Sequence, residues 1–142
     1  NLNAAVGVAQ IERLEDMVAA KRAVAARYDA ALAGRSDTEV MPDAPWARRS
    51  CWLYSVRVAD EDAADDLVRH LDRRAIEARV FWRALSGQAP WRGAARRLSG
   101  VAAGLSGRVV SLPCSSSLAR EDQARVIDAL AAWRGGAPRE AA

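Results

Sequence analysis

The first third of the chain repeats its apolar residues with the period of an α-helix. These residues follow one another at helical spacings: Ile11, Leu14, Val18, Ala25, Tyr28 and Leu32. The spacing predicts one amphipathic helix from Asn1 to Leu32, and Gly34 is a suitable stop just after it. Since average helices have about 11 residues, we expect this one to cross a large surface or to contact another chain.

The start of this predicted helix carries small side chains, at Ala4, Ala5, Gly7 and Ala9. Such positions allow another backbone to come close, as in a contact between subunits. A core helix with an alanine-rich end explains the same pattern, and both interpretations stay open.

Runs of β-branched and aromatic residues predict short strands further along. A β-like stretch covers Thr38 to Met41, and clearer strands cover Ser50 to Val58, Ile76 to Trp82 and Arg108 to Pro113. Prolines and glycines separate them, and the stretch from Ala84 to Gly93 has the composition of a loop.

Helical patterns alternate with these strands. Asp60, Glu61 and Asp62 place negative charge where a helix begins, and the buried face of that helix is predicted to hold Leu67, Val68, Leu71 and Ala75. A weak helix is expected over Ala94 to Leu105. A last helix over Glu121 to Trp133 should point Val126, Ile127, Leu130 and Trp133 inward.

This order of elements indicates an α/β (α+β) fold, in which a long leading helix is followed by a small three- to four-stranded sheet covered by helices. We expect one domain over residues 1–134, with the leading helix at 1–34, and a frayed tail at 135–142. A chain of 142 residues with 51% hydrophobic content is long enough for one core.

Charge and hydropathy narrow the class of protein. No apolar stretch approaches the ~20 residues of a membrane span, and no signal peptide is recognisable, so we expect a soluble, cytoplasmic protein. The formal net charge is +3 and the basic residues are scattered along the chain. A nucleic-acid binder would more often show a basic stripe with interleaved aromatic residues, so neither nucleic acid nor membrane is an expected partner.

The side chains that could carry chemistry give few leads. Cys51 and Cys114 lie far apart in the sequence and favour two buried or half-buried thiols over a disulfide scaffold or a metal site. His70 has no nucleophile near it in sequence, so we expect a surface or edge histidine. Lys21 could in principle bind a carbonyl compound covalently, but its neighbours Arg13, Arg22 and Arg27 favour a solvated lysine.

Four segments, in order, carry a resemblance to a known family. They are NLNAAVGVAQIERLEDM from Asn1, then SCWLYSV, IEARVFW and VVSLPCSSSL. This series resembles the C-terminal region of the DegT/DnrJ/StrS family of pyridoxal-phosphate-dependent sugar aminotransferases, in particular the branch that aminates nucleotide-linked keto sugars, as perosamine synthetases do.

The resemblance implies a small C-terminal domain of a fold-type-I aminotransferase for surface polysaccharide or modified-sugar synthesis. In that family the cofactor lysine and most phosphate contacts belong to an N-terminal domain, and we expect this chain to begin where that domain ends. The implied partners are that missing domain, a nucleotide-sugar substrate and a second copy of the chain. Pyridoxal phosphate is implied for the full-length enzyme, with no catalytic, cofactor or metal residue on this chain.

The resemblance also points to three substrate-binding candidates. Arg79 and Trp82 fall on an arginine and a tryptophan of the family, and Ser86 occupies a loop position that is often histidine. A structural ion pair for Arg79 and a core aromatic role for Trp82 are the alternatives. Where the last helix usually has a Ser or Thr cap, the chain has Ala119, which should cost about 1 kcal/mol unless Ser117 substitutes.

By itself the chain should not transaminate, because that reaction needs a lysine to hold the cofactor and Lys21 is the single lysine. The alternative function is a free-standing, non-catalytic interaction module that has kept the fold. Such a module would have its apolar surfaces covered.

Overall fold

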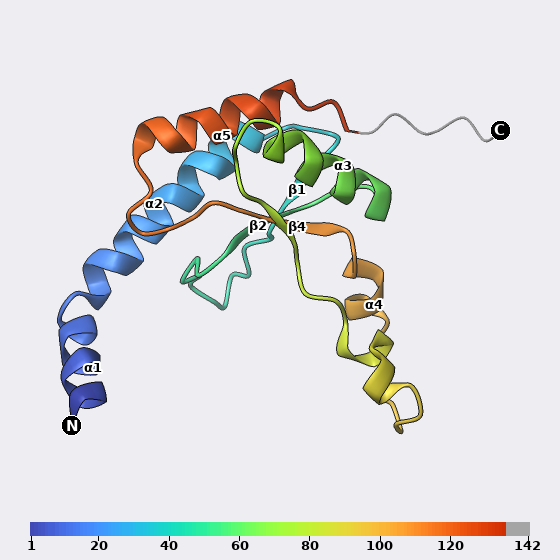
Figure 1. Ribbon diagram of the computed structural model, residues 1–142, viewed down its shortest axis with the longest axis horizontal. Coiled ribbons are helices and arrows are strands. Elements are labelled where there is room, and N and C mark those ends of the chain that lie inside the picture. The colour runs from blue at the N-terminus through green and yellow to red at the C-terminus, as the bar shows by residue number, and fades with distance from the viewer. Residues whose placement is uncertain (136–142) are drawn as a thin grey trace.

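The computed structural model describes residues 1–135, and the predicted tail falls almost entirely outside this range. The elements are, in order, α1 (Leu2–Glu12), α2 (Leu14–Leu32), β1 (Glu39–Val40), β2 (Tyr54–Arg57), α3 (Glu61–Asp72), β3 (Arg79–Val80), the 3-10 turns η1 (Leu85–Gly87) and η2 (Ala89–Trp91), α4 (Val101–Leu105), β4 (Val109–Leu112) and α5 (Arg120–Ala132). Figure 1 shows how they are arranged.

The four strands form one antiparallel sheet in the order β1-β2-β4-β3. Since β2 and β3 both run antiparallel to β4, they point the same way, with β4 between them and α3 as the connection. This is a split β-α-β unit. The predicted α/β (α+β) class with a small sheet and covering helices is confirmed.

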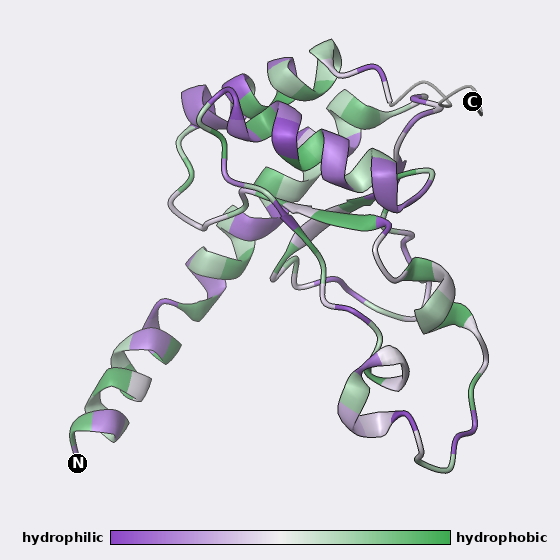
Figure 2. Ribbon diagram, turned by 45° about the vertical axis from the view of Figure 1, so that its right-hand side comes forward, coloured by the Kyte–Doolittle hydropathy of each residue, from purple (hydrophilic) through white to green (hydrophobic). Residues whose placement is uncertain are grey.

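Helices α2, α3 and α5 gather on one face of the sheet, whereas α4 and the segment before it lie on the other side (Figures 1 and 2). The buried core fills the space between the sheet and the three helices. Its most enclosed members come from both layers: Tyr28, Tyr54, Val56, Leu67, Leu71, Val110 and Leu130. Burying one such side chain contributes roughly 1.5–3 kcal/mol.

Three polar contacts join the covering helices to one another. His70 donates from Nε2 to the carbonyl of Ala129, 2.8 Å away, and Trp133 donates from Nε1 to Asp66 Oδ2 at 2.9 Å. Both contacts link α5 or its C-terminal end to α3, while buried Gln123 donates to a carbonyl of α2. The expectation of a surface or edge histidine is therefore wrong, because His70 is buried and holds two helices together.

The predicted single helix from Asn1 to Leu32 is two helices. They meet at Arg13, whose φ of −108° and ψ of 4° interrupt the helical geometry. No residue of α1 is buried, and Ile11 and Leu14 are both exposed. The apolar face that the periodicity predicts is therefore packed in α2, but no neighbour among residues 1–135 encloses α1.

The predicted strands are shorter than their apolar runs. Ser50–Val58 contributes only β2, because Cys51 adopts a left-handed φ of 56° that an extended strand cannot contain. Ile76–Trp82 contributes only β3, which pairs with two residues of β4. The strand predicted near Arg108–Pro113 is confirmed as β4, and the short stretch near Thr38 as β1.

The helical predictions also need boundary corrections. Ala75 lies in an exposed turn after α3 with a φ of 55°, not on the buried face of that helix. Gly100, with a φ of 84°, begins the short α4, so the helix predicted from Ala94 starts much later. The loop from Ala84 contains the turns η1 and η2, whereas α5 agrees with the prediction.

Among residues 1–135, no helix combines the length and the apolar character that crossing a membrane requires.

Candidate functional site

A groove of about 880 Å³ lies along the face of the sheet opposite α2, α3 and α5. Strands β2 and β4 contribute to its floor, and the segments around Met41, Trp52, Trp82 and α4 form its walls. The lining is mainly apolar and includes Ala102 and Leu105 of α4. Figure 2 shows the hydropathy of each element. A cavity of this size and character suits a small organic ligand or an apolar partner segment.

Strand register fixes which side chains reach this face. Tyr54 and Val56 of β2 are buried against the helices, so their neighbours Ser55 and Arg57 point to the other face. Ser55 is paired with Ser111 of β4, and their hydroxyl oxygens are 2.9 Å apart. Of these two serines only Ser55 lines the groove, and its hydroxyl is buried and bonded to Ser111, so the floor is almost entirely apolar.

Aromatic rings form one wall. The ring centroids of Trp52 and Trp82 are 5.9 Å apart, and those of Trp82 and Phe81 are 5.0 Å apart. Trp52 is 64% exposed and Trp82 is 68% exposed. Exposed indole faces of this kind favour stacking against a sugar or a planar ring.

The three predicted substrate-binding residues lie in this region, but only one lines the groove. Trp82 is a wall residue and is not part of the core. Arg79 stands opposite Ser111 in the sheet, is largely exposed, and forms an ion pair in which its Nε is 2.9 Å from Glu77 Oε1. Ser86 is half-buried in η1. Their roles toward a substrate stay predictions.

Lys21 is not the solvated lysine that its neighbours suggested. It is half-buried on α2, and its Nζ donates to the carbonyl oxygens of Trp52 at 2.8 Å and Cys114 at 2.6 Å. Cys114 Sγ is 3.9 Å from the same nitrogen. Lys21 thus ties α2 to the segments that enter β2 and leave β4.

These contacts do not fit a lysine that holds pyridoxal phosphate. Such a lysine needs an amine that is free to bond to the cofactor, whereas Nζ of Lys21 is held by two backbone carbonyls. Within residues 1–135, no three His, Cys, Asp or Glu side chains gather as a metal site would require. Lys21 is therefore not assigned to a chemical step that involves the cofactor.

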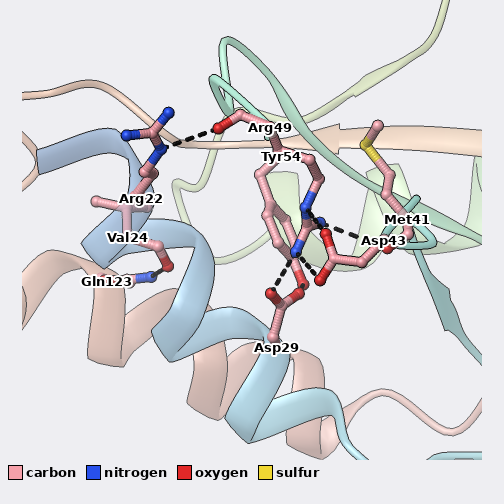
Figure 3. A network of polar contacts seen from close by, with 8 residues as sticks. All are labelled: Arg22, Val24, Asp29, Met41, Asp43, Arg49, Tyr54 and Gln123. Atoms are coloured by element: carbon pink, nitrogen blue, oxygen red, sulfur yellow. Dashed lines mark hydrogen bonds and ion pairs between the residues drawn. The ribbon is translucent and has the colours of Figure 1, made fainter. Parts of the chain in front are cut away.

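A charged network borders the groove and extends to α2 (Figure 3). Asp29 accepts from Tyr54 Oη at 2.8 Å and from Arg49 Nη2 at 3.0 Å. Arg49 also pairs with Asp43 and donates to the carbonyl of Met41, while its own carbonyl accepts from Arg22. The network fixes the segment between β1 and β2, which forms one end of the groove.

The network changes the proton affinities of its members. Burial, and then the hydrogen bond to Asp29, raise the pKa of Tyr54 far above its ordinary value. For Arg49, burial works in the opposite direction, but the hydrogen bond and charge of Asp29 outweigh it and raise the pKa. Both side chains therefore keep their protons at neutral pH and act as donors.

The sequence did not indicate the roles of Lys21, Asp29 or Arg49. Each makes a hydrogen bond to a residue at least 20 positions away, which no local pattern encodes. One weak signal was present, since the chain has a single lysine among 21 Lys and Arg residues.

The chain is similar in sequence to proteins of a known family. The sequence pattern of the DegT/DnrJ/EryC1/StrS aminotransferase family matches residues 1–131. EpsN of Bacillus subtilis, assigned as a pyridoxal phosphate-dependent aminotransferase, is 30% identical over 134 residues, which are 92% of this chain and 34% of EpsN. GDP-perosamine synthase of Caulobacter vibrioides is 29% identical, over 92% of this chain and 36% of that protein.

A solved structure agrees with these sequence relatives. The crystal structure of DesV from S. venezuelae superposes with a TM-score of 0.81 at 28% identity, over 89% of this chain and 34% of DesV. The chain therefore spans about a third of the length of the relatives that it matches.

Proposed function

This chain belongs to the DegT/DnrJ/EryC1/StrS aminotransferase family, and we propose that it forms the small C-terminal domain of a pyridoxal-phosphate-dependent enzyme that aminates a nucleotide-linked keto sugar. The domain covers residues 1–134. The remainder of the polypeptide would carry the cofactor and its lysine. The product would serve surface polysaccharide or modified-sugar synthesis.

The observation that carries this proposal is that the single lysine is held by hydrogen bonds. Lys21 Nζ donates to two carbonyls, while relatives that match the chain are about three times as long. A family member that transaminates therefore needs its cofactor lysine in the part that these residues do not include. Pyridoxal phosphate, when bound there, supplies the electron sink for moving an amino group.

The groove supports a substrate-side role for this domain. Trp82 presents an exposed indole face to a sugar or base, and the guanidinium of Arg79 can donate a pair of hydrogen bonds to a phosphate or carboxylate. The ion pair with Glu77 is exposed, so an anionic ligand could displace it at small cost. Ser86, in the turn that follows, is the third proposed contact.

Helix α1 supports a homodimer. From Leu2 to Ile11 it contains no charged residue, only Asn3 and Gln10 are polar, and none of its residues is buried. A helix of this kind is normally enclosed by protein. Figure 1 shows it extending away from the sheet, so we propose that a second copy covers at least one of its faces.

The test uses the complete protein that contains this chain, assayed for amination of nucleotide-linked keto sugars with an amino donor. Trp82→Ala should raise KM by about tenfold, the factor that matches about 1.4 kcal/mol of lost ring contact. Trp46→Ala is the matched control, because Trp46 is also exposed, at 86% against 68% for Trp82, but does not line the groove. Equal effects of both substitutions would argue against the substrate-side role.

A second measurement separates the two candidate functions. A complete aminotransferase should show the visible absorbance of bound pyridoxal phosphate, and the 142-residue chain alone should not. If the chain occurs alone in cells, is monodisperse and has α1 covered by self-association, the non-catalytic interaction module replaces the aminotransferase domain.

A further inference from the structure

We infer that Lys21 is a positioning residue of the groove: its ammonium group holds the carbonyl of Trp52 and thereby fixes the angle at which the Trp52 indole faces Trp82. The functional meaning of this arrangement rests on the proposed function, because it assumes that the groove takes a ligand. The geometry itself can be tested without any activity.

The contacts around Lys21 converge on the segment that carries Trp52. Nζ lies 2.8 Å from the Trp52 carbonyl and 2.6 Å from that of Cys114. The Cys114 thiol accepts from the backbone N–H of Tyr54 at 3.3 Å. One side chain of α2 therefore fixes the entry to β2 relative to the exit of β4.

The segment of Cys51 and Trp52 has a strained backbone, and the Trp52 side chain has little packing. Cys51, directly before Trp52, has a φ of 56°, a left-handed conformation that is rare for a residue with a Cβ. Trp52 itself is 64% exposed, so its ring is not locked in a core. A strained residue persists only where neighbouring contacts enforce it. The adjacent Trp52 carbonyl accepts from Lys21 Nζ at 2.8 Å and from the Cys114 thiol at the longer distance of 3.7 Å.

The chemistry of the position explains why it is lysine in a chain that otherwise uses arginine. An ammonium group is compact and has three donors that can point to two converging carbonyls. A guanidinium group is a larger planar fork, suited to the parallel oxygens of a carboxylate. Lys21 is the single lysine among 21 basic residues, and it occupies a site where the two side chains are not equivalent.

The experiment measures the exciton couplet that two neighbouring indoles give in far-ultraviolet circular dichroism, using the full 142-residue chain. Trp52→Phe and Trp82→Phe define the signal, because each should abolish it. Lys21→Met keeps the length of the side chain and removes the donors, and we expect loss of the couplet with retention of helical content. Lys21→Arg should not restore the couplet.

Tyr28→Phe is the matched control. It removes another hydrogen bond from the same helix, from Tyr28 Oη to the carbonyl of Pro113 at 2.8 Å, but it keeps the ring that packs on Tyr54 and both hydrogen bonds of Lys21. It should keep the couplet. An unchanged couplet in Lys21→Met, or its loss in Tyr28→Phe to the same extent, overturns the inference. If Lys21→Met does not fold, Lys21→Leu, which also has no donor, is judged by the same criterion.

In the complete protein, Lys21→Met should raise KM for the sugar substrate and leave kcat nearly unchanged, as expected for a residue that shapes a binding wall. Absence of aminotransferase activity in the unmodified protein would refute the proposed function alone. Loss of the couplet in Lys21→Met would still support the positioning role.

Discussion

The two tyrosines of this chain should make it unfold in alkali, with a pH dependence that can be calculated. Tyr28 and Tyr54 are both buried, and their ring centroids are 4.7 Å apart. Each phenol donates a 2.8 Å hydrogen bond, to the carbonyl of Pro113 and to Asp29 respectively. Burial is the main cause that raises the pKa of each phenol far above the ordinary 10.0.

The sign and size of the effect follow from proton linkage. Above pH 10.0 the unfolded chain releases both phenolic protons while the folded chain retains them. The unfolded state then binds fewer protons, so stability is fully present below this pH and falls as the pH rises. Each tyrosine removes about 1.4 kcal/mol per pH unit, or about 2.7 kcal/mol together. Two pH units therefore remove about 5 kcal/mol, comparable with the whole stability of a small domain.

The assay combines urea unfolding at a series of alkaline pH values with ultraviolet absorbance of the phenolate. The chain has only two tyrosines, so this absorbance reports on these residues alone. Phenolate should form together with the loss of helical signal. Tyr54→Phe should cost about 1.5 kcal/mol at neutral pH through the lost hydrogen bond to a carboxylate, and should halve the tyrosine contribution to the pH slope.

Comparison with this variant isolates the tyrosine contribution, because other titrating groups are common to both proteins. Phenolate formation near pH 10 in a chain that keeps its helical signal would refute the reasoning. So would a pH slope that is the same in the variant and the unmodified chain.

Substitutions at three positions, Ala119, Thr38 and Ala75, should change stability in ways that urea titrations can measure. Ala119→Ser supplies the missing side-chain cap of α5 and should stabilise by about 1 kcal/mol, whereas Ser117→Ala should have little effect because Ser117 pairs with Ser115 instead. Thr38→Val should stabilise by about 1 kcal/mol, since the buried Oγ1 of Thr38 has no hydrogen-bond partner among residues 1–135, and Thr38→Ser should destabilise; the opposite order would contradict this. Ala75→Gly relieves a φ of 55° and should gain about 0.5 kcal/mol after the added freedom of the unfolded chain, and a loss would show that the turn is unstrained.

Two exposed apolar surfaces of this chain lie in separate regions. One is the groove, where Trp52, Trp82 and Leu105 are uncovered, and the other is α1. The first agrees with the proposed ligand groove, and the second with the proposal that a second copy covers a face of α1.

The missing cap on α5 illustrates a prediction that local chemistry alone could make. Helix N-termini leave backbone N–H groups without hydrogen-bond partners. An alanine at the N-cap cannot accept a hydrogen bond from them, so the helix lacks that stabilisation whatever its tertiary contacts are. The structure places Ala119 at that position without a side-chain hydrogen bond, as expected. The residue type and the local position were sufficient.

The sequence by itself determined the class of fold, the position of β4, α3 and α5, and the family. These depend on periodicities of two and 3.6 residues and on segments in a fixed order, which are local properties of the chain. The same patterns predicted a leading helix that continues through Arg13, and strands longer than the observed β2 and β3. Local patterns carry no information on where a packing partner ends.

Only the tertiary structure decided the roles of Lys21, Asp29 and His70. A solvated lysine and a surface histidine were reasonable from their neighbours in sequence, yet both are tied to backbone carbonyls 31 to 93 residues away. Which polar groups become buried together depends on how α2, α3 and α5 meet the sheet. Since the cost of burying a polar group without a partner is large, that packing assigns each of them its hydrogen bonds.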